Sequence, residues 1–151
     1  MKRYTASVRR LKRRRRRREP EGVDYWTLAE LRYYIRRFLR ARELAARKAG
    51  IEPQQYLLLL QVKGVEGRQP ATISALADRL QLQHHSTVGL VDRLVRRGWV
   101  ARRRDSRDRR GVLVELRPAG EAVLRRLALF SIKELKTEGP ALVATLRRLI
   151  G

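Results

Sequence analysis

The chain contains no cysteine, and this absence excludes several kinds of chemistry. Disulfides, thiolate metal sites, cysteine nucleophiles and thiol-based sensing of peroxide all require the missing residue. Aromatic residues make up only 6% of the sequence, so leucine, valine and alanine have to fill the core. No apolar run approaches the roughly 20 residues that span a bilayer, and no apolar segment follows the basic N-terminus. We therefore expect a cytoplasmic protein that does not cross a membrane.

Acidic residues are scarce, with 15 Asp and Glu against 37 Lys and Arg, which gives a formal net charge of +22. Charge of this size predicts a polyanionic partner, although it does not by itself distinguish nucleic acid from an anionic membrane. Residues 1–18 contain eleven Lys and Arg and no acid. Such a block repels itself, so we expect a disordered basic tail over residues 1–22. This tail is either a non-specific DNA-binding arm or a solvated extension, such as a mis-assigned start codon would add.

Residues 72–116 have the pattern of a winged helix-turn-helix. Apolar residues at helical spacing indicate a first helix: Ile73, Leu76, Ala77 and Leu80. Thr72 can cap this helix. After a short break, a second helix is predicted from His84 to Gly98, because glycine often ends a helix in the left-handed region. Residues 99–101 and 112–116 are predicted to be paired strands, and residues 102–111 the loop between them. The expected fold is mostly α with a small antiparallel β-hairpin wing.

The second helix and the loop carry side chains that suit duplex DNA. The N-terminal end of a recognition helix meets base edges in the major groove, and arginines farther along can hold phosphates. The loop adds six arginines and two aspartates. We expect Arg107 or Arg109 to reach the minor groove, with Asp108 bracing Arg110. The predicted DNA-binding residues are His84, His85, Ser86, Thr87, Gly89, Arg93, Arg97, Arg104, Arg107, Arg109 and Arg110.

The stretch LVDRLVRRGWVARRRDSRDRRGVLVELRPAG resembles the MarR family of bacterial transcription regulators. The matching elements are the DRL run that ends in a glycine, the Asp-Arg-Arg at residues 108–110, and the strand that leads into Pro-Ala-Gly. The resemblance implies a homodimer that binds a pseudo-palindromic operator and releases it on binding a small aromatic or phenolic effector. The sequence departs from the family in having Gln83 and His84 where Ser or Asp is common, and Arg117 where Thr is common.

Further helices flank this motif on both sides. One is predicted from Thr27, where TLAE forms a capping box with Glu30, to Gly50, and another begins at Pro53. After the wing, a helix is predicted from Pro118 to about Thr137, then a break at Gly139 and Pro140, then a short last helix. Terminal helices this apolar need a partner, and a second copy of the chain supplies one. We expect a domain over residues 23–151, with a DNA-binding part at about 53–116 and dimerisation helices at about 25–50 and 118–151.

Motifs for catalysis and for metal or cofactor binding are lacking. The segment GVEGRQP has no Lys-Ser/Thr of a phosphate-binding loop, and the adjacent side chains of His84 and His85 diverge, so neither a metal site nor a nucleophile with its base is indicated. We predict a sequence-specific, ligand-responsive repressor that acts as a homodimer without cofactors. The alternative is a nucleoid or RNA-associated protein that uses its charge without sequence choice.

Overall fold

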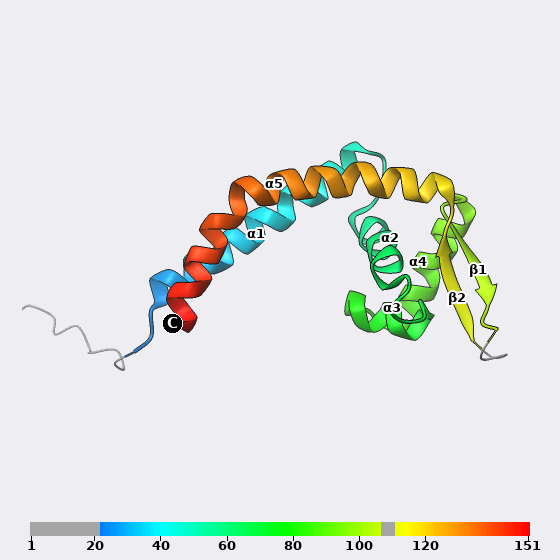
Figure 1. The fold of residues 1–151 in the computed structure, drawn as a ribbon, viewed down its shortest axis with the longest axis horizontal. Helices are drawn as coiled ribbons and strands as arrows, with labels where there is room; N and C mark the ends of the chain where they lie inside the picture. The colour runs from blue at the N-terminus through cyan, green and yellow to red at the C-terminus, as the bar shows by residue number, and fades with distance from the viewer. Residues whose placement is uncertain (1–21, 107–110) are drawn as a thin grey trace, which may run out of the picture.

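The computed structural model describes residues 22–106 and 111–151, which form an arch of helices with a two-stranded wing at one end (Figure 1). Two long helices, α1 and α5, run side by side along one limb of the arch. The other limb contains α2, α3, α4 and the hairpin. The elements are α1 (Tyr25–Lys48), α2 (Pro53–Val65), α3 (Ile73–Leu80), α4 (His84–Arg96), β1 (Val100–Arg104), β2 (Val112–Leu116) and α5 (Pro118–Ile150).

Helix α1 begins two residues earlier than the predicted capping box places it. Asp24 is the N-cap, and its side-chain oxygen accepts a hydrogen bond of 2.9 Å from the backbone N–H of Thr27. Hydrogen bonds from Thr27 hold the pKa of the Asp24 carboxyl below its ordinary value. The prediction that Thr27 and Glu30 form the cap is wrong, because Thr27 lies inside the helix and is buried. An aspartate outside the helix satisfies the orphan amide instead.

Helix α5 is continuous over 33 residues, so the predicted break at Gly139 and Pro140 is wrong. Pro140 lies inside the helix and cannot donate to the carbonyl of Lys136 four residues earlier. Contacts with α1 offset this loss: Arg37 forms an ion pair of 2.9 Å with Glu138, and Arg42 donates to the carbonyl of Ser131. Figure 1 shows α5 curving with α1 rather than stopping.

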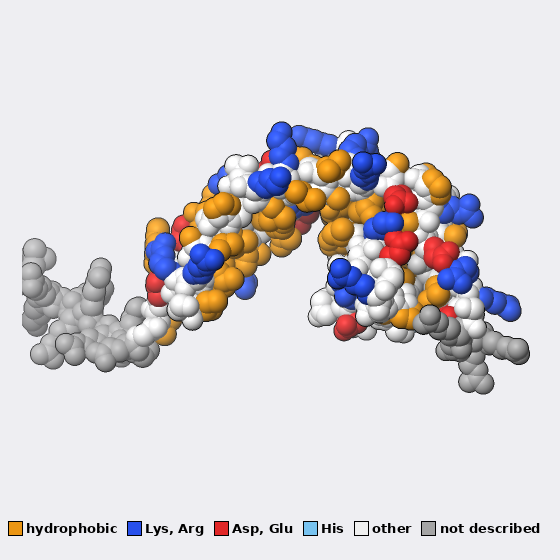
Figure 2. Space-filling view, in the orientation of Figure 1, with side chains coloured by type: hydrophobic (Ala, Val, Ile, Leu, Met, Phe, Trp, Pro, Cys, Tyr) orange, Lys and Arg blue, Asp and Glu red, His pale blue; other side chains and the backbone are white. Residues whose placement is uncertain are grey.

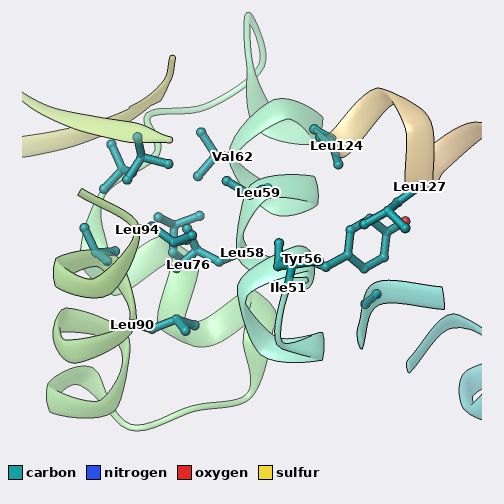
Figure 3. Close-up of a cluster of buried hydrophobic side chains, with 14 residues drawn as sticks. Ile51, Tyr56, Leu58, Leu59, Val62, Leu76, Leu90, Leu94, Leu124 and Leu127 are labelled. Carbon is teal, nitrogen blue, oxygen red and sulfur yellow. The ribbon is translucent and has the colours of Figure 1, made fainter. Parts of the chain in front are cut away.

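The core of the second limb is built from leucine and valine, as the composition requires. Side chains from α2, α3 and α4 meet there and are almost completely buried (Figure 3). The central members are Leu58, Leu59, Leu76, Val91 and Leu94. Thr72 caps α3 as predicted, since its hydroxyl accepts from the N–H of Ala75 at 3.2 Å. The turn to α4 is tight because Gln81 adopts a left-handed conformation with φ of 54°.

The wing is an antiparallel hairpin, as predicted, but its first strand is longer than expected. β1 pairs with β2 from Val100↔Leu116 to Arg104↔Val112, so residues 102–104 belong to β1 and not to the loop predicted over residues 102–111. Thr72 forms a bridge with Leu113, and the N–H of Val114 donates to the carbonyl of Ala71. The start of α3 is therefore fastened to β2, which fixes the wing relative to the helices.

Candidate nucleic-acid interface

One face of α4 is anchored in the core, and this fixes which side chains face outward. Thr87, Leu90, Val91 and Leu94 are buried on the inner face. Thr87 is 0% exposed, and its hydroxyl donates to the carbonyl of Gln83 at 3.1 Å. The sequence placed Thr87 among the DNA-contacting residues. In the structure its side chain points inward and secures the first turn of α4, so it cannot touch a molecule outside.

The outer face of α4 is polar from its first residue. His84, His85 and Ser86 are exposed, and Gly89 follows one turn later and is partly exposed. A Cβ at Gly89 would lie 3.6 Å from a terminal guanidinium nitrogen of Arg93, so the arginine side chain folds back over the glycine. The N-terminal end of α4 therefore exposes two histidines and a serine, and the guanidinium of Arg93 lies over Gly89. The structure thus leaves five of the predicted residues outside the core: His84, His85, Ser86, Gly89 and Arg93.

The wing is coupled to α4 by an ion pair that the sequence analysis did not identify. Arg102 on β1 donates to a carboxylate oxygen of Asp92 on α4 at 2.6 Å, while its neighbour Arg103 pairs with Glu115 across the hairpin at 2.6 Å. Arg104 is exposed and has no ion-pair partner in the described part of the chain. Asp92 and Arg102 lie on different elements, and the sequence alone does not show that α4 and β1 meet at these two residues. Arg107, Asp108, Arg109 and Arg110 lie outside the described residues.

Arg97, predicted to hold a phosphate, is bound within the protein. Its guanidinium donates to the side chain of Gln55 at 3.1 Å and to the carbonyl of Gly50 at 2.9 Å. It also stacks on the ring of Trp99. These contacts tie the C-terminal end of α4 to the connection between α1 and α2. The structure therefore gives Arg97 a role in holding the two limbs together.

A second feature is an apolar pocket of about 470 Å³ between α1, α2 and α5. Phe38, Leu39, Leu57, Leu60, Ile132 and Leu135 supply most of its apolar lining. Its wall also includes Glu43 and Arg42, and Arg42 is only 8% exposed. The terminal nitrogens of Arg42 donate to the carbonyls of Phe38 and Ser131, whereas its buried Nε has no hydrogen-bond partner among the described residues. Burial lowers the pKa of Arg42, but arginine stays protonated in proteins, so a positive charge borders this pocket.

Within residues 22–106 and 111–151, His, Cys, Asp and Glu form no group of three that could hold a metal ion. The same residues include no helix long and apolar enough to cross a membrane. The described residues instead form a helix-turn-helix, α3 and α4, followed by a basic hairpin, β1 and β2. This arrangement defines the chain as a winged helix-turn-helix protein.

Comparison with known proteins shows a similarity to one family. The family model described as "MarR family" matches residues 49–111, which include α2 to β1. The solved structure of wild-type MarR from E. coli, in its apo form, is 25% identical, with a TM-score of 0.66 over 86% of this chain and 96% of that chain. A probable transcriptional regulator from Pseudomonas aeruginosa is 27% identical, with a TM-score of 0.58 over 83% and 97% of the two chains. Residues 49–111 are thus similar to the MarR family of DNA-binding transcription regulators, and the fold of the whole chain is MarR-like.

One similar structure contains nucleic acid. A mutant of MepR from S. aureus, bound to an oligodeoxyribonucleotide, is 17% identical, with a TM-score of 0.61 over 85% of this chain and 97% of that chain. Identity this low supports the fold alone. No curated protein matches the chain.

Proposed function

We propose that the chain is a repressor that binds its operator with the outer face of α4. His84, His85, Ser86 and Gly89 meet base edges in the major groove, and Arg93 holds a phosphate beside them. The observation that carries the proposal is the exposed polar end of α4, held by a buried inner face and joined to the wing through Asp92 and Arg102. Arg104, with Arg107, Arg109 and Arg110 beyond the described residues, supplies the basic wing, from which Arg107 or Arg109 reaches the minor groove.

A competition experiment tests sequence-specific binding. A labelled fragment selected from the organism's own genome is bound at moderate salt, and unlabelled bulk DNA is added as competitor. A specific regulator prefers its site by roughly 10³-fold or more. Equal competition by bulk DNA would favour the alternative, a nucleoid or RNA-associated protein, for which the eleven basic residues of the N-terminal tail are the supporting observation. Derepression of a reporter on deleting the chain tests the repressor role.

The proposed active form is a homodimer, because α1 and α5 expose many large apolar side chains. Leu28, Ile35 and Leu39 on α1 and Leu129, Ile132, Val143 and Leu146 on α5 are each between 38% and 59% exposed. Contiguous apolar surface of this kind marks an interface. In this arrangement residues 25–50 and 118–151 dimerise, while residues 53–116 bind two half-sites about 34 Å apart. Light scattering at low micromolar concentration should give twice the chain mass of 17.7 kDa.

The apolar pocket is the proposed effector site, and its lining suits a small aromatic or phenolic molecule. It lies between the α1–α5 limb and α2, the first helix of the DNA-binding limb. A ligand wedged there changes the angle between the limbs and therefore the separation of the two α4 helices in a dimer. The coupling free energy expected for such an effect is about 1–3 kcal/mol. Leu57→Trp should fill the pocket and abolish ligand-induced release of DNA while leaving operator affinity in the absence of ligand unchanged.

A further inference from the structure

The helical limb is more basic than the limb that carries the helix-turn-helix. Residues 22–50 and 117–151 contain 14 Lys and Arg against 6 Asp and Glu, a net charge of +8. Residues 51–116 contain 12 against 7, a net charge of +5. Figure 2 shows Lys and Arg side chains on the helical limb as well as on the limb that carries the wing. A limb that serves only to dimerise has no need of this charge.

Part of the excess is ordered into a row on α1. Arg32, Arg36, Arg40 and Arg47, here called the α1 arginine row, are all exposed. At 3.6 residues per turn they lie on the face opposite the one that packs on α5, where Thr27, Phe38 and Arg42 point inward. The first three are spaced by four residues, so their Cα atoms follow one another at intervals of about 6 Å along the helix.

The charges of this row are almost uncompensated. The side chains of Arg32, Arg36 and Arg47 have no ion pair or hydrogen bond within residues 22–106 and 111–151. Arg40 pairs only with Glu43, at a long distance of 3.4 Å. Beside the row is an open hollow of about 690 Å³, whose wall holds three arginines and one acid: Tyr33, Arg36, Arg37, Leu39, Arg40 and Glu43. Like charges in a row repel one another unless a polyanion lies along them.

The row does not suit the proposed subunit interface. Burying guanidinium groups without partners is costly, because the desolvation of each charge needs a compensating interaction. The exposed apolar residues Leu28, Ile35 and Leu39 lie on an adjacent face of α1, and that face is the one suited to a second subunit. The arginine row therefore stays accessible in a dimer.

We infer that the α1 arginine row is a second DNA-binding surface, which holds the phosphate backbone of a duplex other than the one bound by α4. The inference rests on the proposed function, because operator binding brings DNA to the protein. A straight row of arginines at regular intervals fits a continuous line of phosphates and has no means of selecting bases. A dimer would then bridge an operator to a second DNA segment without sequence preference at the second site.

The test uses the full chain bound to an immobilised operator duplex, washed, and then offered a labelled duplex without the operator. The test variant combines Arg32→Gln, Arg36→Gln and Arg40→Gln. The matched control combines Arg125→Gln, Lys133→Gln and Lys136→Gln, three exposed basic residues on α5 that also have no ion-pair partner in the described residues. Both variants remove three charges and keep the N-terminal tail.

The test variant should stay dimeric and occupy the operator as the parent does, but capture roughly tenfold less of the second duplex than the parent or the control. The salt dependence of capture should weaken by about 0.9 in log–log slope for each phosphate that the variant no longer neutralises. Equal capture by the test variant and the parent, equal reduction in both variants, or a monomeric test variant would each overturn the inference. If the parent does not occupy the operator, the proposed function fails instead. Direct binding of bulk duplex by the two variants then decides the role of the row.

Discussion

The guanidinium carbon of Arg97 lies 3.7 Å above the centre of the indole ring of Trp99. The same arginine donates to Gln55 and to the carbonyl of Gly50, and the carbonyl of Trp99 accepts from the N–H of Arg117 at the start of α5. This pair of residues therefore connects the end of α4 to the segment after α1 and to the start of α5.

Arg97→Ala should destabilise the fold by about 1–3 kcal/mol, because it removes one cation–π contact and two hydrogen bonds. Urea denaturation measures this change in the free energy of unfolding. The control is Arg96→Ala, one residue earlier, which is exposed and has no side-chain hydrogen bond or ion pair among the described residues. Its effect should stay within about 0.5 kcal/mol. If both variants are destabilised equally, the contacts of Arg97 do not join the limbs.

Gly120→Ala should destabilise the fold by about 2 kcal/mol or more, because overpacking forces the backbone to move. A Cβ at this position would lie 2.2 Å from the carbonyl oxygen of Trp99, which is backbone and cannot rotate away. The matched control in the same helix is Gly139→Ala, where an added Cβ meets nothing within 4 Å. That substitution should stabilise α5 by about 0.4–1 kcal/mol. Thermal denaturation followed by circular dichroism distinguishes the two outcomes.

Asp24→Asn should weaken the start of α1 at neutral pH but not in acid. The pKa of Asp24 is lowered from its ordinary value of 3.8 by hydrogen bonds from Thr27. A lowered folded-state pKa means stability that is present above the unfolded-state pKa and lost as the pH falls through the folded-state pKa. The urea midpoints of parent and variant should therefore differ at pH 7 and converge in acid, as the pH falls below 3.8 and through the lower folded-state pKa. A difference that persists in acid would show that the charge of Asp24 is not what caps α1.

Asp92→Asn should strengthen DNA binding while changing stability by less than about 1 kcal/mol, because the pair with Arg102 is exposed. The substitution removes a negative charge beside the proposed phosphate contacts and releases Arg102 for the backbone. Affinity for bulk DNA should rise more than affinity for the operator, so the ratio between them should fall. Fluorescence anisotropy with both DNAs measures the ratio. A matched change on α3, Asp78→Asn, should leave this ratio unaltered.

Much of the DNA-binding limb could be predicted because its signals are local. Thr72 as a cap, His84 as the first residue of α4 and the strand over Val112–Leu116 each follow from a few neighbouring residues, and the structure confirms all three. The predicted cap of α1 is wrong. Asp24 and Thr27 are both residue types that cap helices well, and the structure uses Asp24. A local pattern does not decide between two caps three residues apart.

Periodicity, caps and composition are properties of the chain alone, and they were enough to establish the helix-turn-helix, the order of the elements and the excess of positive charge. Other features depend on how the helices pack. α5 continues through Pro140 because α1 packs along it, and Arg37 reaches Glu138 only when the two helices lie side by side. Thr87 is buried because its face of α4 packs against the core. Arg97 is bound within the protein because folding brings the carbonyl of Gly50 within its reach. Contacts between residues distant in the chain form only on folding. Their contribution to the free energy of folding therefore cannot be read from any local stretch of sequence.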